Sequence, residues 1–89
     1  MNQEWFDKKN KLHRDNDQPA LIEENGDQSW YKHGKLHRDN DQPAVICSSG
    51  SKSWYQHDVR HRDNELPSVI RTNGEKLWYF FDSKINKGK

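Results

Sequence analysis

The residues best suited to chemistry belong to a His-Arg-Asp-Asn string that this chain of 89 residues carries three times. Its histidines, His13, His37 and His61, are 24 residues apart. Histidine and aspartate bind zinc, but the ligands of one ion lie within about 4 Å of each other. If each string belongs to one β-hairpin, equivalent histidines lie two strands apart, roughly 9 to 10 Å. A single string supplies too few ligands, so we expect no metal and no cofactor.

The same string invites comparison with the catalytic loop of protein kinases, which begins with His-Arg-Asp. A kinase also needs a nucleotide-binding lobe with a glycine-rich loop, and 89 residues have room for neither. No motif places a nucleophile beside a base, because Ser48, Ser49 and Ser51 surround a turn. Three near-identical copies of one residue set suit a scaffold better than a single active site. We therefore predict that the protein is not an enzyme.

An arginine of each string directly precedes an aspartate. Our structural interpretation is that each arginine reaches a carboxylate of the neighbouring unit, while Asp and Asn side chains accept backbone N–H groups. The alternative is a displayed recognition row for a partner or an anionic ligand. Nucleic acid is not the expected partner, because every unit carries its own acidic residues and the net charge is only +1. The candidate partner-binding residues of this row are Arg14, Arg38, Arg62, His37 and His61.

The elements that must position these strings are themselves repeated. The 24-residue period predicts a single domain over residues 1–89, with units at about 5–29, 30–53 and 54–77 and a partial unit at 78–86. Strict spacing would put Phe6 where Trp30 lies. Since the first unit starts with Trp5, its opening turn over residues 7–11 should carry one extra residue. We expect residues 84–89 to form a flexible tail.

Within a unit the side chains alternate with a period of two, as in a strand: Ala44 and Ile46 face one way, Val45 and Cys47 the other. Asn25–Gly26 and its equivalents predict tight turns, because Asn and Gly tolerate positive φ. A polar connector, residues 39–43 in the middle unit, should bulge from the sheet, because proline cannot donate to a ladder. The predicted fold class is all-β, an antiparallel meander of about three and a half β-hairpin units in one elongated twisted sheet.

Aromatic residues form two rows in this fold. One row is the expected core, stacked over Leu12, Leu36 and the isoleucines, and its members are Trp30, Trp54 and Trp78 with Phe6. The other row falls on the opposite face by alternation, and no helix in the sequence would cover it. It is a candidate partner-binding surface made of Tyr31, Tyr55 and Tyr79. The alternative is that these tyrosines pack on the stems of neighbouring Lys and Arg side chains.

Composition indicates a cytoplasmic protein with no membrane contact. The single cysteine, Cys47, cannot form an internal disulfide, and a solvent-facing strand position explains it better than a reactive thiol. No apolar stretch near the N-terminus would serve as a signal peptide or a membrane span.

Residues 30–39 (WYKHGKLHRD), followed by residues 43–46 (PAVI) and Gly50, resemble MORN-like repeats. The closer likeness is to a variant, W-Y-x-N-G-K-L-H-R-(D/E)-(D/N)-G-P-A, that occurs in tandem in large DNA viruses, phages and bacteria. The likeness covers roughly residues 5–82 and implies hairpin units that act as interaction scaffolds. This chain departs from the pattern because the glycine before the proline is replaced and the turn glycine occurs only at Gly34. The basic clusters that would bind lipid headgroups are also missing.

These observations predict a non-enzymatic protein-interaction module whose partner is another protein. The resemblance adds a sharper hypothesis, a small phage-encoded inhibitor that blocks a host defence enzyme in the host cytoplasm, as anti-CRISPR proteins do. Open sheet edges also favour a homodimer. The alternative is a binder of anionic ligands or nucleic acid through the His-Arg row.

Overall fold

The computed structural model describes residues 2–64, 66–81 and 83–85. Alternating apolar positions, β-branched residues and frequent turn residues produce short strands throughout. They are β1 (Gln3–Glu4), β2 (Leu21–Ile22), β3 (Gln28–Ser29), β4 (Tyr31–Lys32), β5 (Lys35–Leu36), β6 (Val45–Ile46), β7 (Lys52–Ser53), β8 (Tyr55–Gln56), β9 (Val59–Arg60), β10 (Val69–Ile70), β11 (Lys76–Phe80) and β12 (Ser83–Ile85).

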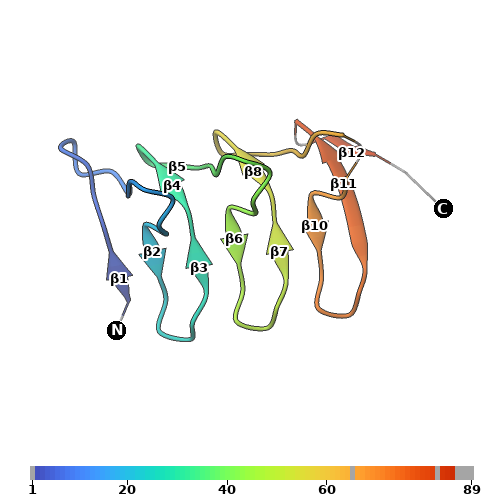
Figure 1. The fold of residues 1–89 in the computed structure, drawn as a ribbon, viewed down its shortest axis with the longest axis horizontal. Coiled ribbons are helices and arrows are strands. Elements are labelled where there is room, and N and C mark those ends of the chain that lie inside the picture. The colour runs from blue at the N-terminus through green and yellow to red at the C-terminus, as the bar shows by residue number, and fades with distance from the viewer. Residues whose placement is uncertain (1, 65, 82, 86–89) are drawn as a thin grey trace.

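Eight of these strands form one antiparallel sheet in the order β1-β2-β3-β6-β7-β10-β11-β12. The strands lie side by side along the long axis of a body that measures 44 × 24 × 18 Å (Figure 1). The predicted all-β antiparallel meander is confirmed. The hairpins β4–β5 and β8–β9 form two small sheets of their own above the main sheet.

Residues 84 and 85, which we expected in a flexible tail, belong to β12 and pair with β11. Residues 86–89 lie outside the described part of the chain. The described residues contain no helix that could cross a lipid bilayer.

Two kinds of turn close the hairpins, and they differ in backbone conformation. The turns along the lower edge of the molecule in Figure 1, called the lower turns, contain Gly26, Gly50 and Gly74, each with positive φ. They lie where the sequence predicts them. Asn25 does not share the positive φ that we expected. Its side chain instead accepts a hydrogen bond from the Asp27 N–H at 3.0 Å, which bridges Gly26.

The upper turns are of type I′, because both central residues have positive φ: 50° and 86° at His33 and Gly34, 51° and 73° at His57 and Asp58. The first unit is longer, and the Asp7 N–H donates to the Lys11 carbonyl at 2.8 Å across the predicted extra residue.

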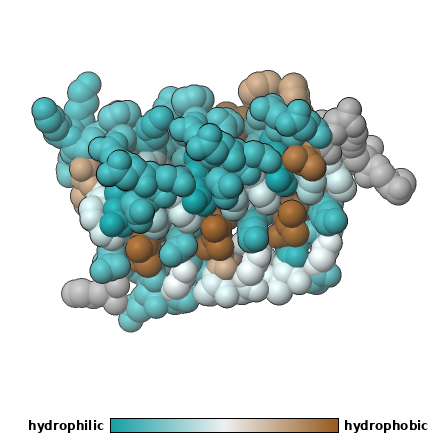
Figure 2. Space-filling view, in the orientation of Figure 1, coloured by the Kyte–Doolittle hydropathy of each residue, from teal (hydrophilic) through white to brown (hydrophobic). Residues whose placement is uncertain are grey.

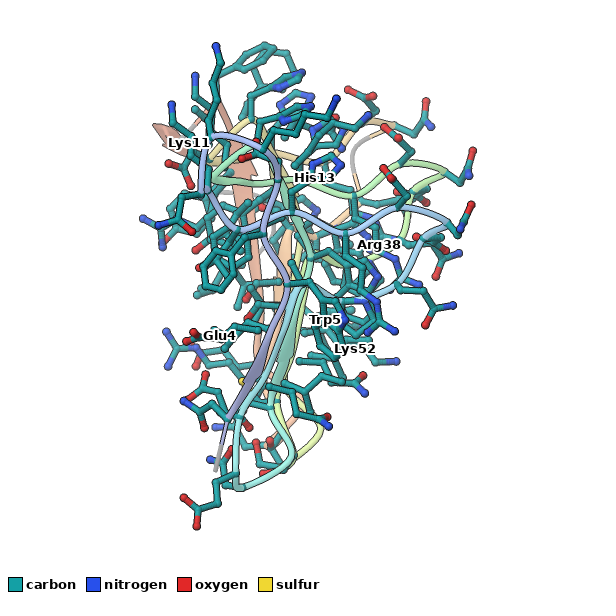
Figure 3. The ribbon with its side chains drawn as sticks, turned by 90° about the vertical axis from the view of Figure 1, so that its left-hand side faces the viewer. Glu4, Trp5, Lys11, His13, Arg38 and Lys52 are labelled. Carbon is teal, nitrogen blue, oxygen red and sulfur yellow. The ribbon has the colours of Figure 1, made fainter. Side chains whose placement is uncertain are left out.

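The connectors contain a further left-handed pair in each of the first two units. Asn16 and Asp17 have φ of 63° and 57°, and Asn40 and Asp41 have φ of 62° and 57°. This geometry folds each connector back over one face of the sheet. Figure 3 shows that face on the right, with Trp5, Arg38 and Lys52 labelled on it, while Glu4 lies on the left. We call the right-hand side the connector face.

The buried core lies between the sheet and the connectors. Trp30 and Trp54 are 7% and 6% exposed, and Ala20 and Ala44 are fully buried beside them. Ser68 replaces the third alanine, and its buried hydroxyl accepts a hydrogen bond from the Tyr79 N–H at 2.7 Å. The tryptophan core is therefore sealed by the chain's own loops.

Two details of the expected core are wrong. Phe6 is 49% exposed, and Trp5 takes the place equivalent to Trp30, because the extra residue lies after both. Leu36 pairs directly with Tyr31, and Leu12 with Phe6, so these leucines share the face of the tyrosines and do not lie under the tryptophans.

Candidate functional site

The arginines of the repeated string bind the units to one another. Arg38 Nε and Nη2 donate to the two Asp17 carboxylate oxygens at 2.9 and 3.2 Å, and Nη1 donates to the Pro43 carbonyl at 3.1 Å. The guanidinium lies 3.8 Å from the ring centroid of Trp30, whose indole N–H donates to the Asp17 carbonyl at 3.1 Å. The predicted contact between each arginine and a carboxylate of the neighbouring unit is confirmed here.

The next unit repeats this arrangement closely. Arg62 binds the Asp41 carboxylate at 2.9 and 3.2 Å and the Pro67 carbonyl at 2.9 Å. It stacks on Trp54 at 3.8 Å, and the indole N–H of Trp54 donates to the Asp41 carbonyl at 3.0 Å. One aspartate thus binds both the arginine and the tryptophan of the following unit.

The first unit has only part of this set. Arg14 lies 3.6 Å from the Trp5 ring centroid and donates to the Pro19 carbonyl at 3.2 Å. Among the described residues, no carboxylate binds the Arg14 guanidinium.

The histidines are structural as well. The buried ring of His37 accepts the His57 N–H at Nδ1 (3.2 Å) and bonds through Nε2 to Asp39 at 2.7 Å. Because Nδ1 accepts, the proton of the neutral ring must lie on Nε2. The hydrogen bond from His37 is the main cause that lowers the pKa of Asp39. We had expected this aspartate to accept backbone N–H groups, but its partners are His37 and Lys32.

His61 makes the same contacts with Asp63 at 2.6 Å and with the Phe81 N–H at 3.3 Å. His13 binds Asp15 and the His33 N–H in the first unit. Each histidine therefore attaches its unit to the upper turn of the next one. Since His37 and His61 are 8% and 5% exposed, neither can serve as a displayed recognition residue.

The predicted tyrosine row lies on the other side of the sheet. Cross-strand partners share a face, and one row across the main sheet consists of Leu21, Ser29, Val45, Ser53, Val69 and Leu77. Tyr31, Tyr55 and Tyr79 lie two residues beyond members of this row, so they extend it upward. These six row residues and three tyrosines are called the tyrosine face below.

The tyrosines are half-buried on this face. Burial raises the pKa of Tyr31, and the negative charges of Asp58 and Glu23 raise it further. The Arg60 guanidinium lies 4.1 Å from the ring centroid of Tyr79, so the alternative, packing of a tyrosine on an arginine, occurs at this position. No described segment covers the tyrosine face, because the connectors fold over the opposite side (Figure 3).

The connector face differs in character. Figure 2 views it directly and shows a hydrophilic upper part above separate hydrophobic areas set between hydrophilic ones. The register explains this alternation, because one row across the sheet reads Ile22, Gln28, Ile46, Lys52, Ile70 and Lys76. Two small hollows lie between successive connectors, with volumes of about 230 and 200 Å³. The first hollow is lined by three basic side chains and three acidic ones, Arg14, Lys32 and Arg38 with Asp15, Asp17 and Asp39. In the second, Arg62 faces Asp39, Asp41 and Asp63, so neither described lining offers net positive charge to an anionic ligand.

A larger hollow at the N-terminal end was not predicted from the sequence. It has a volume of about 640 Å³, and its lining includes the exposed residues Phe6, Lys8, Lys9 and Lys11. The sequence signal for it is the inserted residue, which enlarges the lysine-rich first turn.

No group of three or more His, Cys, Asp or Glu residues within the described chain has a geometry that could hold a metal ion. Cys47 follows β6 and is half-buried, and burial raises the pKa of its thiol, which disfavours the reactive thiolate.

The structure separates the predicted site residues into two sets. Arg38, Arg62, His37 and His61 hold units together on the connector face, whereas the tyrosines lie on the opposite, uncovered face. No protein-family model, curated protein or solved structure matches this chain.

Proposed function

We propose that this chain is a non-enzymatic protein-interaction module that binds a partner protein through its tyrosine face. The observation that carries the proposal is that the chain's own loops cover one face of the sheet and leave the other uncovered. The connector face is closed by the chain's own loops, and its Arg38, Arg62 and histidines are used in contacts between units. The tyrosine face combines aromatic rings and aliphatic side chains without a covering layer, as interfaces commonly do.

The size of the tyrosine face is sufficient for this role. The body extends 44 by 24 Å along its two longer axes, and a standard interface buries about 800 Å² on each partner. Three tyrosines add large, rigid contact area at low entropic cost.

A sharper form of the proposal rests on the resemblance to MORN-like repeats of phages and on the small size of the chain. In this form the protein is an inhibitor that acts in the host cytoplasm, where it covers the working surface of a bacterial defence enzyme. The single cysteine agrees with a reducing compartment.

Co-purification tests the proposal. The tagged chain would be incubated with a bacterial lysate or a purified defence complex and analysed by size-exclusion chromatography with light scattering. Tyr31→Ser combined with Tyr55→Ser should abolish a stoichiometric complex that the unmodified chain forms. Lys52→Ser, on the connector face, is the matched control and should leave the complex intact.

Two other outcomes would redirect the proposal. The purified chain alone could have the molar mass of two chains, and the double tyrosine variant that of one chain. This result would identify a homodimer that forms through the tyrosine face. The alternative function, an anionic ligand held by the His-Arg row, requires salt-dependent binding that Arg38→Ala removes. The pairing of Arg38 with Asp17 counts against that alternative.

A further inference from the structure

The N-terminal edge of the sheet lacks a neighbour that every equivalent interior strand has. Strand β3 lies between β2 and β6, and β7 lies between β6 and β10. Strand β1 corresponds to them in the first unit but pairs only with β2 among the described strands. Figure 3 looks directly onto this end of the molecule. Its outer edge thus presents backbone groups in the position where a preceding unit would pair.

The side chains at this end also lack contacts that their equivalents in the next unit make. Trp5 and Arg14 stack as Trp30 and Arg38 do, and Arg14 is held by the same proline carbonyl contact. In the second unit, Asp17 accepts the hydrogen bonds of the remaining donors. Its carboxylate accepts from Arg38, and its backbone carbonyl accepts from the indole N–H of Trp30. Among the described residues, nothing supplies either acceptor to Arg14 and Trp5.

The chain therefore shows, in two interior copies, what chemistry completes this site. Each occupant is an Asn-Asp pair with left-handed backbone at Asn16–Asp17 or Asn40–Asp41, followed by Gln-Pro-Ala and a short strand. We propose that the N-terminal edge binds a partner segment of this kind: an acidic type I′ turn whose carboxylate pairs with Arg14, continued by a strand that adds to β1. This strand addition uses the general mechanism of β-augmentation.

Charge supports an acidic partner at this end. Lys8, Lys9 and Lys11 are exposed and outnumber the two acidic residues, Asp7 and Asp15, in the lining of the hollow of about 640 Å³ beside the first turn. Arg14 adds a fourth positive charge that no described carboxylate neutralises. These charges would attract a turn that carries aspartates and raise the rate of its encounter.

An intact second copy cannot supply the occupant from its own repeats. Its turn-and-strand segments end in β2, β6 and β10, and each of these strands already pairs on both sides. The occupant is therefore a turn-and-strand segment of the stated chemistry from outside these repeats. This site is separate from the tyrosine face, and the two proposals can be tested independently.

A peptide titration tests the site. The probe is the chain's own segment 39–46, Asp-Asn-Asp-Gln-Pro-Ala-Val-Ile with blocked ends, added to the ¹⁵N-labelled full chain and followed by NMR. Saturable shifts of the Trp5 indole N–H and the Arg14 Nε–H at millimolar peptide are the expected result. A peptide with asparagine in place of the second aspartate should bind about tenfold more weakly, the equivalent of one charged hydrogen bond.

Protein variants complete the test. Arg14→Ala should reduce binding about tenfold or more, and Arg14→Lys should also weaken it, because lysine keeps the charge but loses the bidentate geometry. Tyr31→Ser should leave peptide binding unchanged, which separates this site from the tyrosine face. Absence of shifts at Trp5 and Arg14, or equal binding of both peptides, would overturn the proposal.

Discussion

Replacing Arg62 with alanine tests whether the arginines hold the units together. The guanidinium makes three contacts that the mutation removes: the stack on Trp54 at 3.8 Å, the bond to the Pro67 carbonyl at 2.9 Å and the pair with Asp41 at 2.9 and 3.2 Å. The Arg62 side chain is 14% exposed and that of Asp41 is 48% exposed. The ion pair is therefore well screened, while the stack and the carbonyl bond are largely shielded from water.

These contacts give a loss of about 3 kcal/mol in the free energy of unfolding. The cation–π stack contributes about 1 kcal/mol at a partly exposed site. The bond from a charged donor to a carbonyl contributes about 1.5 kcal/mol. The ion pair with a half-exposed aspartate contributes at most about 1 kcal/mol. For a domain of this size the sum corresponds to a fall of roughly 12 to 24 °C in Tm.

Urea denaturation followed by tryptophan fluorescence would measure the loss, and the chain contains its own control. Arg14 has the same stack and the same proline contact but no described carboxylate partner. Arg14→Ala should therefore cost about 1 kcal/mol less than Arg62→Ala. Asp41→Asn combined with Arg62→Ala should show a coupling energy of about 1 kcal/mol, because asparagine tolerates the left-handed backbone but loses the charge.

A free energy for Arg62→Ala within about 0.5 kcal/mol of the unmodified chain, the range of ordinary surface substitutions, would refute this reasoning. The arginines would then be free for recognition, and the alternative function at the His-Arg row would regain support.

Four further substitutions probe the core, a turn and the acid response. Trp54→Ala should cost roughly 3 to 5 kcal/mol in urea denaturation, whereas Phe6→Ala at an exposed ring should cost far less. Gly50→Ala should lose about 1 to 2 kcal/mol by thermal unfolding, because φ is 106° and the added Cβ meets no atom within 4 Å, so only backbone strain acts. Acid titration should show stability falling between pH of about 4 and 2, because the hydrogen bond from His33 lowers the pKa of Asp7 from 3.8 to about 2. Asp7→Asn should remove part of that fall and leave the part due to Asp27 and Asp39, whose pKa values are also lowered.

The sign of the acid prediction follows from the direction of the pKa shift. The folded form binds the Asp7 proton less readily than the unfolded form, so the contribution is present above the unfolded pKa and is lost as pH falls toward the folded value. Equal stabilities for Trp54→Ala and Phe6→Ala would show that the tryptophans are not the core. A Gly50→Ala variant as stable as the original would contradict the strain assigned to this turn, and unchanged acid sensitivity in Asp7→Asn would remove Asp7 as its cause.

The sequence alone determined the repeat, the strand class and the positions of the turns. A 24-residue period with two-residue alternation leaves little choice except stacked hairpins, because each unit is too small to bury its own core. The inserted residue before Lys11 also followed from aligning the units, and so did the interpretation, confirmed at Arg38 and Arg62, that an arginine reaches a carboxylate of the neighbouring unit.

The tertiary structure decided which face is closed. Both faces carry aromatic and aliphatic rows, so alternation cannot show which one the connectors cover. That choice depends on the left-handed backbone at pairs such as Asn40–Asp41, which directs each loop over the tryptophans. Likewise, the burial of His37 and the pairing of Arg38 with Asp17 depend on contacts between residues about 20 positions apart in the chain, which exist only once the units are stacked.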